Sequence, residues 1–147
     1  MLQQAAKLII KVWKKTQTKE PREQAHGFFT YFNDIENLLA IKNAVKTVDD
    51  ALCLNNLEKA LAVRAGYRIK NTMTQFLKKA EEGVSENERV NTLFAVDIVQ
   101  MAQSHMIYVA FKIFREAIEN PATFKCPNLR THMLNLARVF AIHELLQ

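Results

Sequence analysis

Apolar residues recur at helical spacing along most of the chain, and this pattern predicts an all-α protein. The longest such segment, residues 85–119, contains no glycine or proline, opens with Ser85 and Glu88 at capping-box spacing, and is followed by Asn120-Pro121. We therefore expect one long helix here. Apolar side chains cover most of its circumference, which indicates a central helix with partners on several sides: Leu93, Val96, Ile98, Val99, Met101, Ala102, Met106, Ile107, Val109, Ala110, Phe111, Ile113, Phe114 and Ile118.

Two further segments carry a helical period and flank the central one. Residues 56–82 predict a helix that is followed by Gly83. Its inward-facing side chains are predicted to be Leu57, Ala60, Leu61, Ala65, Ile69, Met73, Phe76, Leu77 and Ala80. Residues 129–146 predict another helix, whose inward-facing side chains are expected to be Leu129, Met133, Leu136, Ala137, Phe140 and Ile142. Because the connections are short, we expect an antiparallel helical bundle in which both segments pack on the central helix.

The first 52 residues have a weaker pattern. Residues 2–15 predict an amphipathic helix with Leu2, Ala5, Ala6, Ile9, Val12 and Trp13 on its apolar side, and residues 16–26 predict an exposed loop. The aromatic group Phe28, Phe29, Tyr31 and Phe32 predicts an anchor in the core. Residues 35–52 are compatible with one more helix, through Leu38, Leu39, Ile41, Val45, Val48 and Leu52.

Both ends of the chain fall on helical apolar patterns. Met1 stands directly on the first pattern without a capping residue, and the last pattern reaches Gln147 without a stop signal. We therefore expect residues 1–147 to be a single helical region truncated at both ends. The apolar surfaces around Leu2, Ile9, Ile10 and Trp13 and around residues 141–146 are then expected to be exposed.

Composition agrees with a single all-α region. The 147 residues are 49% hydrophobic and include only three glycines and three prolines, too few for the turns of a sheet protein. Cys53 and Cys126 have no paired spacing, which excludes a disulfide scaffold or a zinc ribbon. No apolar run reaches the ~18 residues of a membrane span, and the lysines near the N-terminus follow the apolar centre, unlike those of a signal peptide.

Several catalytic and metal-binding patterns are excluded residue by residue. The segment from His143 to Gln147 begins like the zinc-protease motif HExxH, but glutamine stands where the second histidine is required. His26, His105, His132 and His143 have no spacing that places two ligands on one helix face, so no metal site is expected. Phosphate-binding glycine loops and G-x-S-x-G are also absent from the sequence.

The net charge of +5 leaves open an anionic partner. One basic run contains Lys7, Lys11, Lys14 and Lys15, and another contains Arg64, Arg68, Lys70, Lys78 and Lys79. Acidic residues are interspersed between the runs and few aromatic residues lie among them, which favours solvated helix faces. We expect no nucleic-acid partner.

Four sequence blocks together resemble the C-terminal helical region of the acyl-CoA oxidases and of oxidase-like proteins. They are MLQQAAKLIIKVWKK, FTYFND, NNLEKALAVRAGYRIKN and NTLFAVDIVQMAQSHMIYVAFKIFREAI, in the family's order. The most specific elements are Val96–Val99, Ala102–His105 and Tyr108–Phe114, supported by Leu57-Glu58 and Arg64-Ala65 in the preceding helix. The resemblance implies a helical bundle like the C-terminal part of acyl-CoA dehydrogenases and oxidases.

The resemblance also implies a reaction that this chain does not complete. Acyl-CoA oxidases are FAD-dependent enzymes of peroxisomal fatty-acid β-oxidation that dehydrogenate acyl-CoA at Cα–Cβ and reduce oxygen to hydrogen peroxide. Their glutamate base lies in a T-Y-E-G motif before the helix that resembles residues 2–15, so no catalytic residue is assigned in this chain and its flavin-binding residues stay unknown. We expect the isolated chain neither to retain FAD nor to turn over acyl-CoA.

The family resemblance further implies an acyl-CoA substrate, a homodimer and a peroxisomal location for the full-length protein. The final residues HELLQ are not an S-K-L-type peroxisomal signal, so without the family's address a cytoplasmic location is expected. Two functions stay open: a helical part of an oxidase, or a stand-alone helical module whose basic faces bind an acidic partner.

Overall fold

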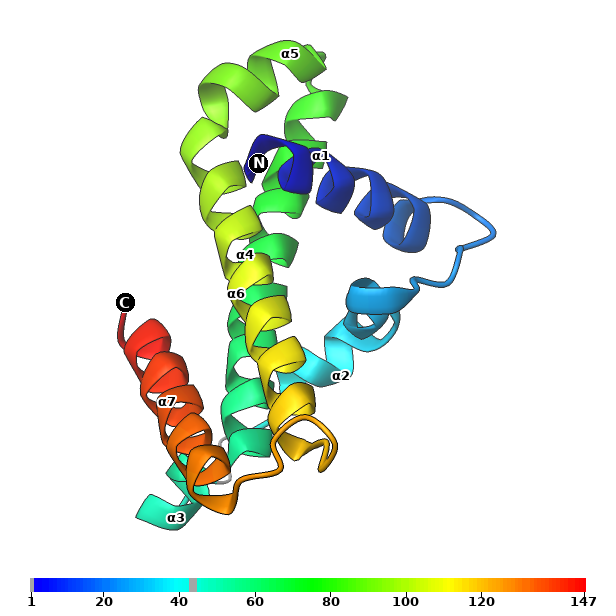
Figure 1. Ribbon diagram of the computed structural model, residues 1–147. Coiled ribbons are helices and arrows are strands. Elements are labelled where there is room, and N and C mark those ends of the chain that lie inside the picture. The colour runs from blue at the N-terminus through cyan, green and yellow to red at the C-terminus, as the bar shows by residue number, and fades with distance from the viewer. Residues whose placement is uncertain (1, 43–44) are drawn as a thin grey trace. The chain divides into compact units, whose positions relative to one another are not determined.

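The computed structural model describes residues 2–42 and 45–147, without the side chain of Leu2 (Figure 1). The described residues contain helices and connecting segments and no strand, so the predicted all-α class is confirmed. The α-helices are α1 (Leu2–Trp13), α2 (Ile35–Ala40), α3 (Val48–Leu52), α4 (Leu54–Glu81), α5 (Glu86–Glu88), α6 (Ala95–Glu119) and α7 (Pro127–Leu146). Two π-helical turns, η1 (Lys14–Thr18) and η3 (Arg89–Leu93), and one 3-10 helix, η2 (Gly27–Asp34), complete the chain.

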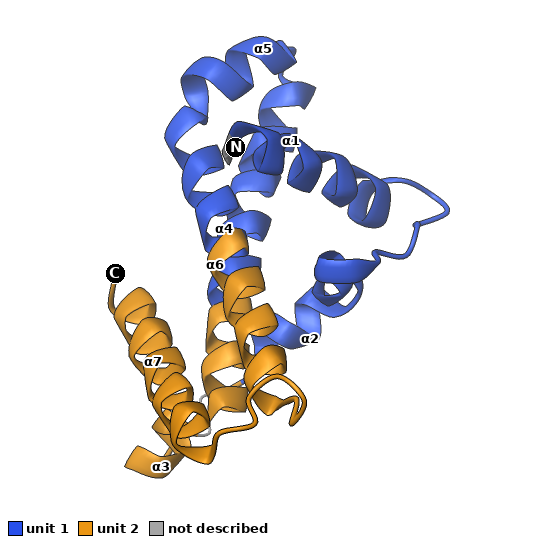
Figure 2. Cartoon of the chain, viewed as in Figure 1, with its two compact units in different colours: residues 1–41, 63–105 blue, residues 42–62, 106–147 orange. Residues whose placement is uncertain are grey.

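The chain divides into two compact units (Figure 2). Unit 1 comprises residues 1–41 and 63–105, and unit 2 comprises residues 42–62 and 106–147. Within unit 1, Arg68 of α4 bonds Ser104 of α6, and the ring of Phe76 lies 5.9 Å from that of Phe94. A later position on α4 therefore contacts an earlier position on α6, so the two helices run in opposite directions. This confirms the predicted antiparallel arrangement.

Unit 1 has a continuous apolar core to which α1 contributes four side chains. Ala6, Ile9, Ile10 and Trp13 are each at most 6% exposed, and the Trp13 and Phe32 rings meet edge to face at 5.5 Å. The expectation that this helix exposes its apolar face is therefore wrong. Its partners lie within the same unit, in η2, α4 and the start of α6, and spacing along the sequence did not indicate them. The predicted contribution of Leu2 lies outside the described side chains.

The predicted single helix over residues 85–119 is wrong, because the chain bends by 81° between residues 86–93 and 95–119. Ser85 does cap the start, accepting a hydrogen bond from the Glu88 amide at 3.2 Å. Five-residue hydrogen bonds then replace the α-helical ones, as in Phe94 N–H to the Arg89 carbonyl at 3.0 Å. No glycine or proline marks the bend, and its anchor is the Arg89 side chain.

Arg89 is only 6% exposed and links the bend to the end of α4. Its guanidinium lies 4.2 Å from the centre of the Phe76 ring. It donates to the carbonyl of Phe76 at 2.9 Å and to that of Val84 at 3.1 Å. A buried cation is thus paired with two carbonyl oxygens and an aromatic face, which explains why the chain turns back here.

Two boundaries in the first part of the chain also differ from the prediction. Residues 16–18, expected in a loop, continue the first helix as the π-helical turn η1, and Thr16 is buried. The helix expected over residues 35–52 is instead α2 and α3, with residues 43–44 outside the described part. The reason is local: Thr47 and Asp50 form a capping box that starts a new helix at Val48.

Unit 2 contains the start of α4, α3, the second half of α6, and α7. Arg130 of α7 donates to the carbonyl of Ile118 at 3.1 Å, and Arg138 donates to the carbonyl of Leu52 at 3.1 Å. Ala137 and Ala141 are the fully buried residues of α7, while Leu129 and Leu136, predicted to face inward, are 47% and 57% exposed. Small side chains therefore make the close contact, and the larger ones lie on the outside.

The second half of α6 buries one stripe rather than most of its circumference. Tyr108, Val109, Phe111 and Ile118 are buried, whereas Met106 and Ile113 are 40% and 47% exposed. Val96 and Val99, earlier on the same helix, are exposed as well. Among the described residues no single helix is long and apolar enough to cross a membrane. The bent pair of segments 86–93 and 95–119 has sufficient length and apolar content when the two are counted together, and these two properties alone support a span.

Candidate functional site

The side chain of unit 1 whose pKa is shifted most strongly is a histidine buried on α6. His105 is 3% exposed, and Ser104 beside it is 1% exposed. Both lie on the stripe of α6 that contacts the core, where Met101 and Ala102 are completely buried one turn earlier. Two polar side chains thus stand where helical spacing alone would place apolar ones.

Aromatic residues of η2 enclose the His105 imidazole. The Tyr31 hydroxyl lies 2.8 Å from Nδ1, and the Phe29 ring stacks on the imidazole at 4.6 Å between centres with an angle of 11°. Phe29 and Tyr31 both contact Phe32, which is fully buried. The predicted aromatic anchor is confirmed for Phe32, while Phe28 is 44% exposed and lies outside it.

Ser104 joins the same region of α6 to α4. Arg68 donates to its hydroxyl oxygen at 3.0 Å, and the hydroxyl donates to the carbonyl of Gln100 at 2.9 Å. A serine that bonds the carbonyl four residues earlier satisfies its own hydrogen without a second helix. The oxygen is then free to accept from Arg68, so one small side chain connects two long helices.

Burial lowers the pKa of His105 from 6.5 to about 4. The imidazole is therefore neutral at neutral pH, because the charged form would lose its hydration without gaining an anionic partner. In the neutral ring, one nitrogen donates and the other accepts, and the Tyr31 hydroxyl is able to match either tautomer. The arrangement fixes η2 against α6, and it presents no charged group to a substrate.

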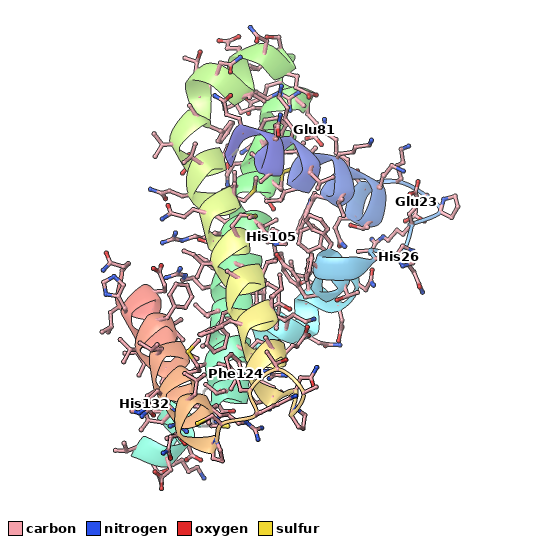
Figure 3. The ribbon with its side chains drawn as sticks, in the orientation of Figure 1. Glu23, His26, Glu81, His105, Phe124 and His132 are labelled. Carbon is pink, nitrogen blue, oxygen red and sulfur yellow. The ribbon has the colours of Figure 1, made fainter. Side chains whose placement is uncertain are left out.

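The other histidines do not join this group. Figure 3 shows His26 on the segment before η2 and His132 on α7, and both are exposed, as is His143. No group of three or more His, Cys, Asp or Glu side chains that suits a metal ion occurs within residues 2–42 and 45–147. Cys53 and Cys126 are free and exposed.

A flavin does not fit the His105 cluster. The hydroxyls of Tyr31 and Ser104 and Nη1 of Arg68 are bonded to groups within unit 1, and the Phe29 ring covers the imidazole. His105 is also buried, so its ring is not open to the nitrogen and oxygen atoms of an isoalloxazine ring. The cluster is therefore not assigned to FAD.

A second group of charged side chains lies in unit 2. Nε of Arg115 is 3.0 Å from Oε2 of Glu58, although the two are not aligned as a hydrogen bond, and Arg115 also reaches Asn55 at 3.4 Å. Burial raises the pKa of the Glu58 carboxyl, and the charge of Arg115 opposes that rise. Burial together with the charge of Glu58 raises the pKa of Tyr108. This pair connects α4 to α6 within unit 2.

Of the residues in these two groups, the sequence singled out His105, Arg68 and Glu58, and it placed Phe29 and Tyr31 in an aromatic core anchor, but it did not indicate which of them contact one another. Tyr31 and His105 are 74 positions apart, and no periodic pattern links them. The signal in the sequence was the placement of a histidine and a serine on the apolar stripe of a helix. Lys70, from the same basic run as Arg68, instead pairs with Glu36 of α2.

Comparison with known proteins gives one family. The model of a family described as acyl-CoA oxidase matches residues 53–147, which include α4, the bend, α6 and α7. The first 52 residues lie outside the match. No curated protein and no solved structure gives a significant match.

Proposed function

Because the chain belongs to the acyl-CoA oxidase family, we propose that its helices form the helical part of an enzyme that dehydrogenates acyl-CoA thioesters at Cα–Cβ. The observation that carries this proposal is the family match over residues 53–147, the segment that holds both long helices. In such an enzyme, FAD accepts the hydride and oxygen reoxidises it. The helices described here contribute rigid packing rather than reacting groups.

The proposed role of this chain is support, because none of its described groups suits a catalytic base. The 147 residues contain no T-Y-E-G run. Glu58, whose carboxyl has a pKa raised by burial, faces Arg115 at 3.0 Å, so its charge is already used in packing α4 on α6 within unit 2. We therefore propose that the isolated polypeptide neither retains FAD nor oxidises acyl-CoA.

The same proposal includes association of the chain with a second copy of itself and a peroxisomal location. One side of α7 carries large apolar side chains at intervals of seven, three and seven residues, and these are 47–81% exposed: Leu129, Leu136, Val139 and Leu146. Such a row supports association through helix packing. The location rests on the family, whose reaction takes place in the peroxisome.

Flavin and peroxide measurements on the purified polypeptide test this role. After incubation with excess FAD and removal of free flavin, we expect no stoichiometric flavin absorbance and no hydrogen peroxide from medium- or long-chain acyl-CoA. A full-length acyl-CoA oxidase is the positive control. Bound flavin together with acyl-CoA-dependent peroxide would show that these residues contain a complete active site.

The alternative function is a stand-alone helical module that binds an acidic partner. A specific feature favours it: five lysines within residues 7–19 line one hollow. Both functions predict no peroxide from the isolated chain, and both allow it to bind an anion. Flavin retention and peroxide production by a chimaera, in which residues 53–147 replace the helical region of an active acyl-CoA oxidase, discriminate between them.

A further inference from the structure

A hollow of about 380 Å³ on the surface of unit 1 is lined mainly by lysines. Lys7, Lys11, Lys14, Lys15 and Lys19 form its wall, and Glu86 is the acidic residue in the lining. The sequence pattern indicated only the first four, and it favoured a solvated face. The structure adds Lys19 and a concave shape, neither of which is visible from helical spacing.

The π-helical turn η1 brings Lys19 into line with the other lysines. Lys7, Lys11 and Lys14 follow one another at four- and three-residue intervals on α1 and the start of η1, so they share a face. An α-helix would place residue 18, a threonine, next on that face. Instead, the Lys19 amide donates to the Lys14 carbonyl at 3.2 Å, a five-residue hydrogen bond that shifts the register by one.

Much of this positive charge has no ionic partner in the described chain. Lys14 pairs with Glu86 at 2.9 Å and Lys15 pairs with Glu23 at 2.9 Å. Lys7, Lys11 and Lys19 form no direct ion pair with any described residue, although the hydrogen bond and charge of Lys15, together with the charge of Lys19, lower the pKa of the Glu23 carboxyl. Each unpaired ammonium adds repulsion to its neighbours, and a bound anion removes that repulsion.

We propose that the hollow is a binding site for a small ligand carrying two or more closely spaced phosphate groups. Lysine ammonium groups bind phosphate as point charges and donate up to three hydrogen bonds each. Several of them around one concavity match an anion of multiple charge better than a single carboxylate. The site is distinct from the His105 cluster, and it does not depend on the oxidase role.

Two observations favour a small ligand over a macromolecule or a membrane. Among the described residues no aromatic side chain lines the hollow, so they offer no platform on which nucleic-acid bases stack. The apolar side of α1 is buried through Ile9 and Trp13, so this helix is not available to lie in a lipid surface. Closely spaced phosphates are shared by two sources: they are linked to each other in free polyphosphates, and they sit on neighbouring ring carbons in bisphosphorylated inositol headgroups.

Isothermal titration of the whole chain with inorganic pyrophosphate tests the proposal, with orthophosphate as a singly phosphorylated comparison. We expect pyrophosphate to bind more tightly than orthophosphate, with an affinity that falls as salt is raised. Vesicles containing a bisphosphorylated inositol lipid separate the two sources. Binding of pyrophosphate without vesicle binding supports a free ligand, and binding of both supports a headgroup.

Three variants locate the site. Lys7→Gln and Lys11→Gln should each weaken pyrophosphate binding about fivefold, the effect of one charge at about 4 Å in water. Glu86→Gln should strengthen it by a similar factor, because it removes the competing carboxylate and frees Lys14. Lys125→Gln, an equal change of net charge at an exposed lysine outside the hollow, is the matched control and should change little.

Other results would overturn the proposal. These are no measurable binding of pyrophosphate, equal affinity for orthophosphate, vesicle binding without pyrophosphate binding, or an equal loss in Lys125→Gln. Far-ultraviolet circular dichroism of each variant shows that folding is unchanged, as expected for the exposed side chains of Lys7 and Lys11.

Discussion

The hydroxyl of Tyr31 lies 2.8 Å from Nδ1 of His105, across 74 positions of sequence. This contact joins the 3-10 helix η2, an aromatic segment near the N-terminus, to the buried stripe of α6. Because His105 is only 3% exposed, its protonation state is tied to the folding of unit 1.

The stability of the protein should fall as the pH drops below neutral because of His105. Its pKa is about 4 in the folded protein and 6.5 when unperturbed, so between these values the unfolded state binds more protons. The histidine's contribution is therefore complete above pH 6.5 and is lost toward pH 4. We expect a loss of about 2 kcal/mol in the free energy of unfolding between pH 7 and pH 5.

Urea denaturation at a series of pH values measures this loss. His105→Gln should remove most of the pH dependence in that interval, in addition to lowering stability at pH 7. The exposed His132 is the matched control, and His132→Gln should keep the wild-type dependence. An unchanged slope in His105→Gln would contradict the assignment of the titration to the buried ring.

Phe111 and Phe28 offer the same substitution at a buried and an exposed site. Phe111 is completely buried, so Phe111→Ala should lower the free energy of unfolding by about 3–5 kcal/mol. Phe28 is 44% exposed, so Phe28→Ala should lower it by less than about 1 kcal/mol. Trp13→Ala should resemble Phe111→Ala, since Trp13 is 6% exposed and packs on Phe32. Thermal and denaturant melts give the three values, and a harmless Trp13→Ala would indicate that α1 does not pack as described.

Replacing Arg89 should loosen the bend between α5 and α6. Arg89→Met leaves the carbonyls of Phe76 and Val84 without their donor, and we expect a loss of about 2–3 kcal/mol. Arg89→Lys keeps the charge but has no planar fork, so it should recover only part of the loss. Arg22, whose side chain is 62% exposed, is the control for removal of an arginine. Hydrogen exchange of residues 86–94 reports the loosening directly, and unchanged exchange in Arg89→Met would contradict this role.

The Glu58–Arg115 pair should be coupled in a double-mutant cycle. The side chains of Glu58 and Arg115 are 15% and 20% exposed, so Arg115→Met leaves a mostly buried carboxylate without its cation and should cost about 1–3 kcal/mol. In Glu58→Gln the same Arg115→Met change should cost less, because the stranded charge is gone. Additive losses in the double variant would show that the pair contributes no interaction energy.

The sequence predicted the helices whose determinants are local or periodic. The segment α4 was predicted nearly to the residue, because apolar positions recur through it and Gly83, with φ of +84°, follows its end. The pattern did not indicate the 81° bend at Phe94, because a π-helical turn needs no glycine or proline. The cause is a contact with Phe76, a residue of another helix.

Burial was harder to predict than helicity. A stripe of apolar residues indicates which side of a helix is suited to burial, but not whether another element covers that side. The predictions for α1 and α7 were wrong in opposite directions. The side of α1 that was expected to be exposed is covered by unit 1, while Leu136 on α7 lies outside because Ala137 and Ala141 make the closer contact. The contact of Tyr31 with His105 and the place of Lys19 in the hollow were not predicted for a related reason, since the neighbours of both residues are set by the fold.

The flavin content of a chimaera tests most directly whether these helices belong to an oxidase. In it, residues 53–147 replace the corresponding helical region of an active acyl-CoA oxidase, and a second chimaera carries Phe111→Asp as a packing control. The first chimaera should purify with close to one FAD per chain and produce peroxide from acyl-CoA, and the second should lose flavin. A first chimaera that folds, as judged by circular dichroism, yet holds no flavin would contradict the proposed role.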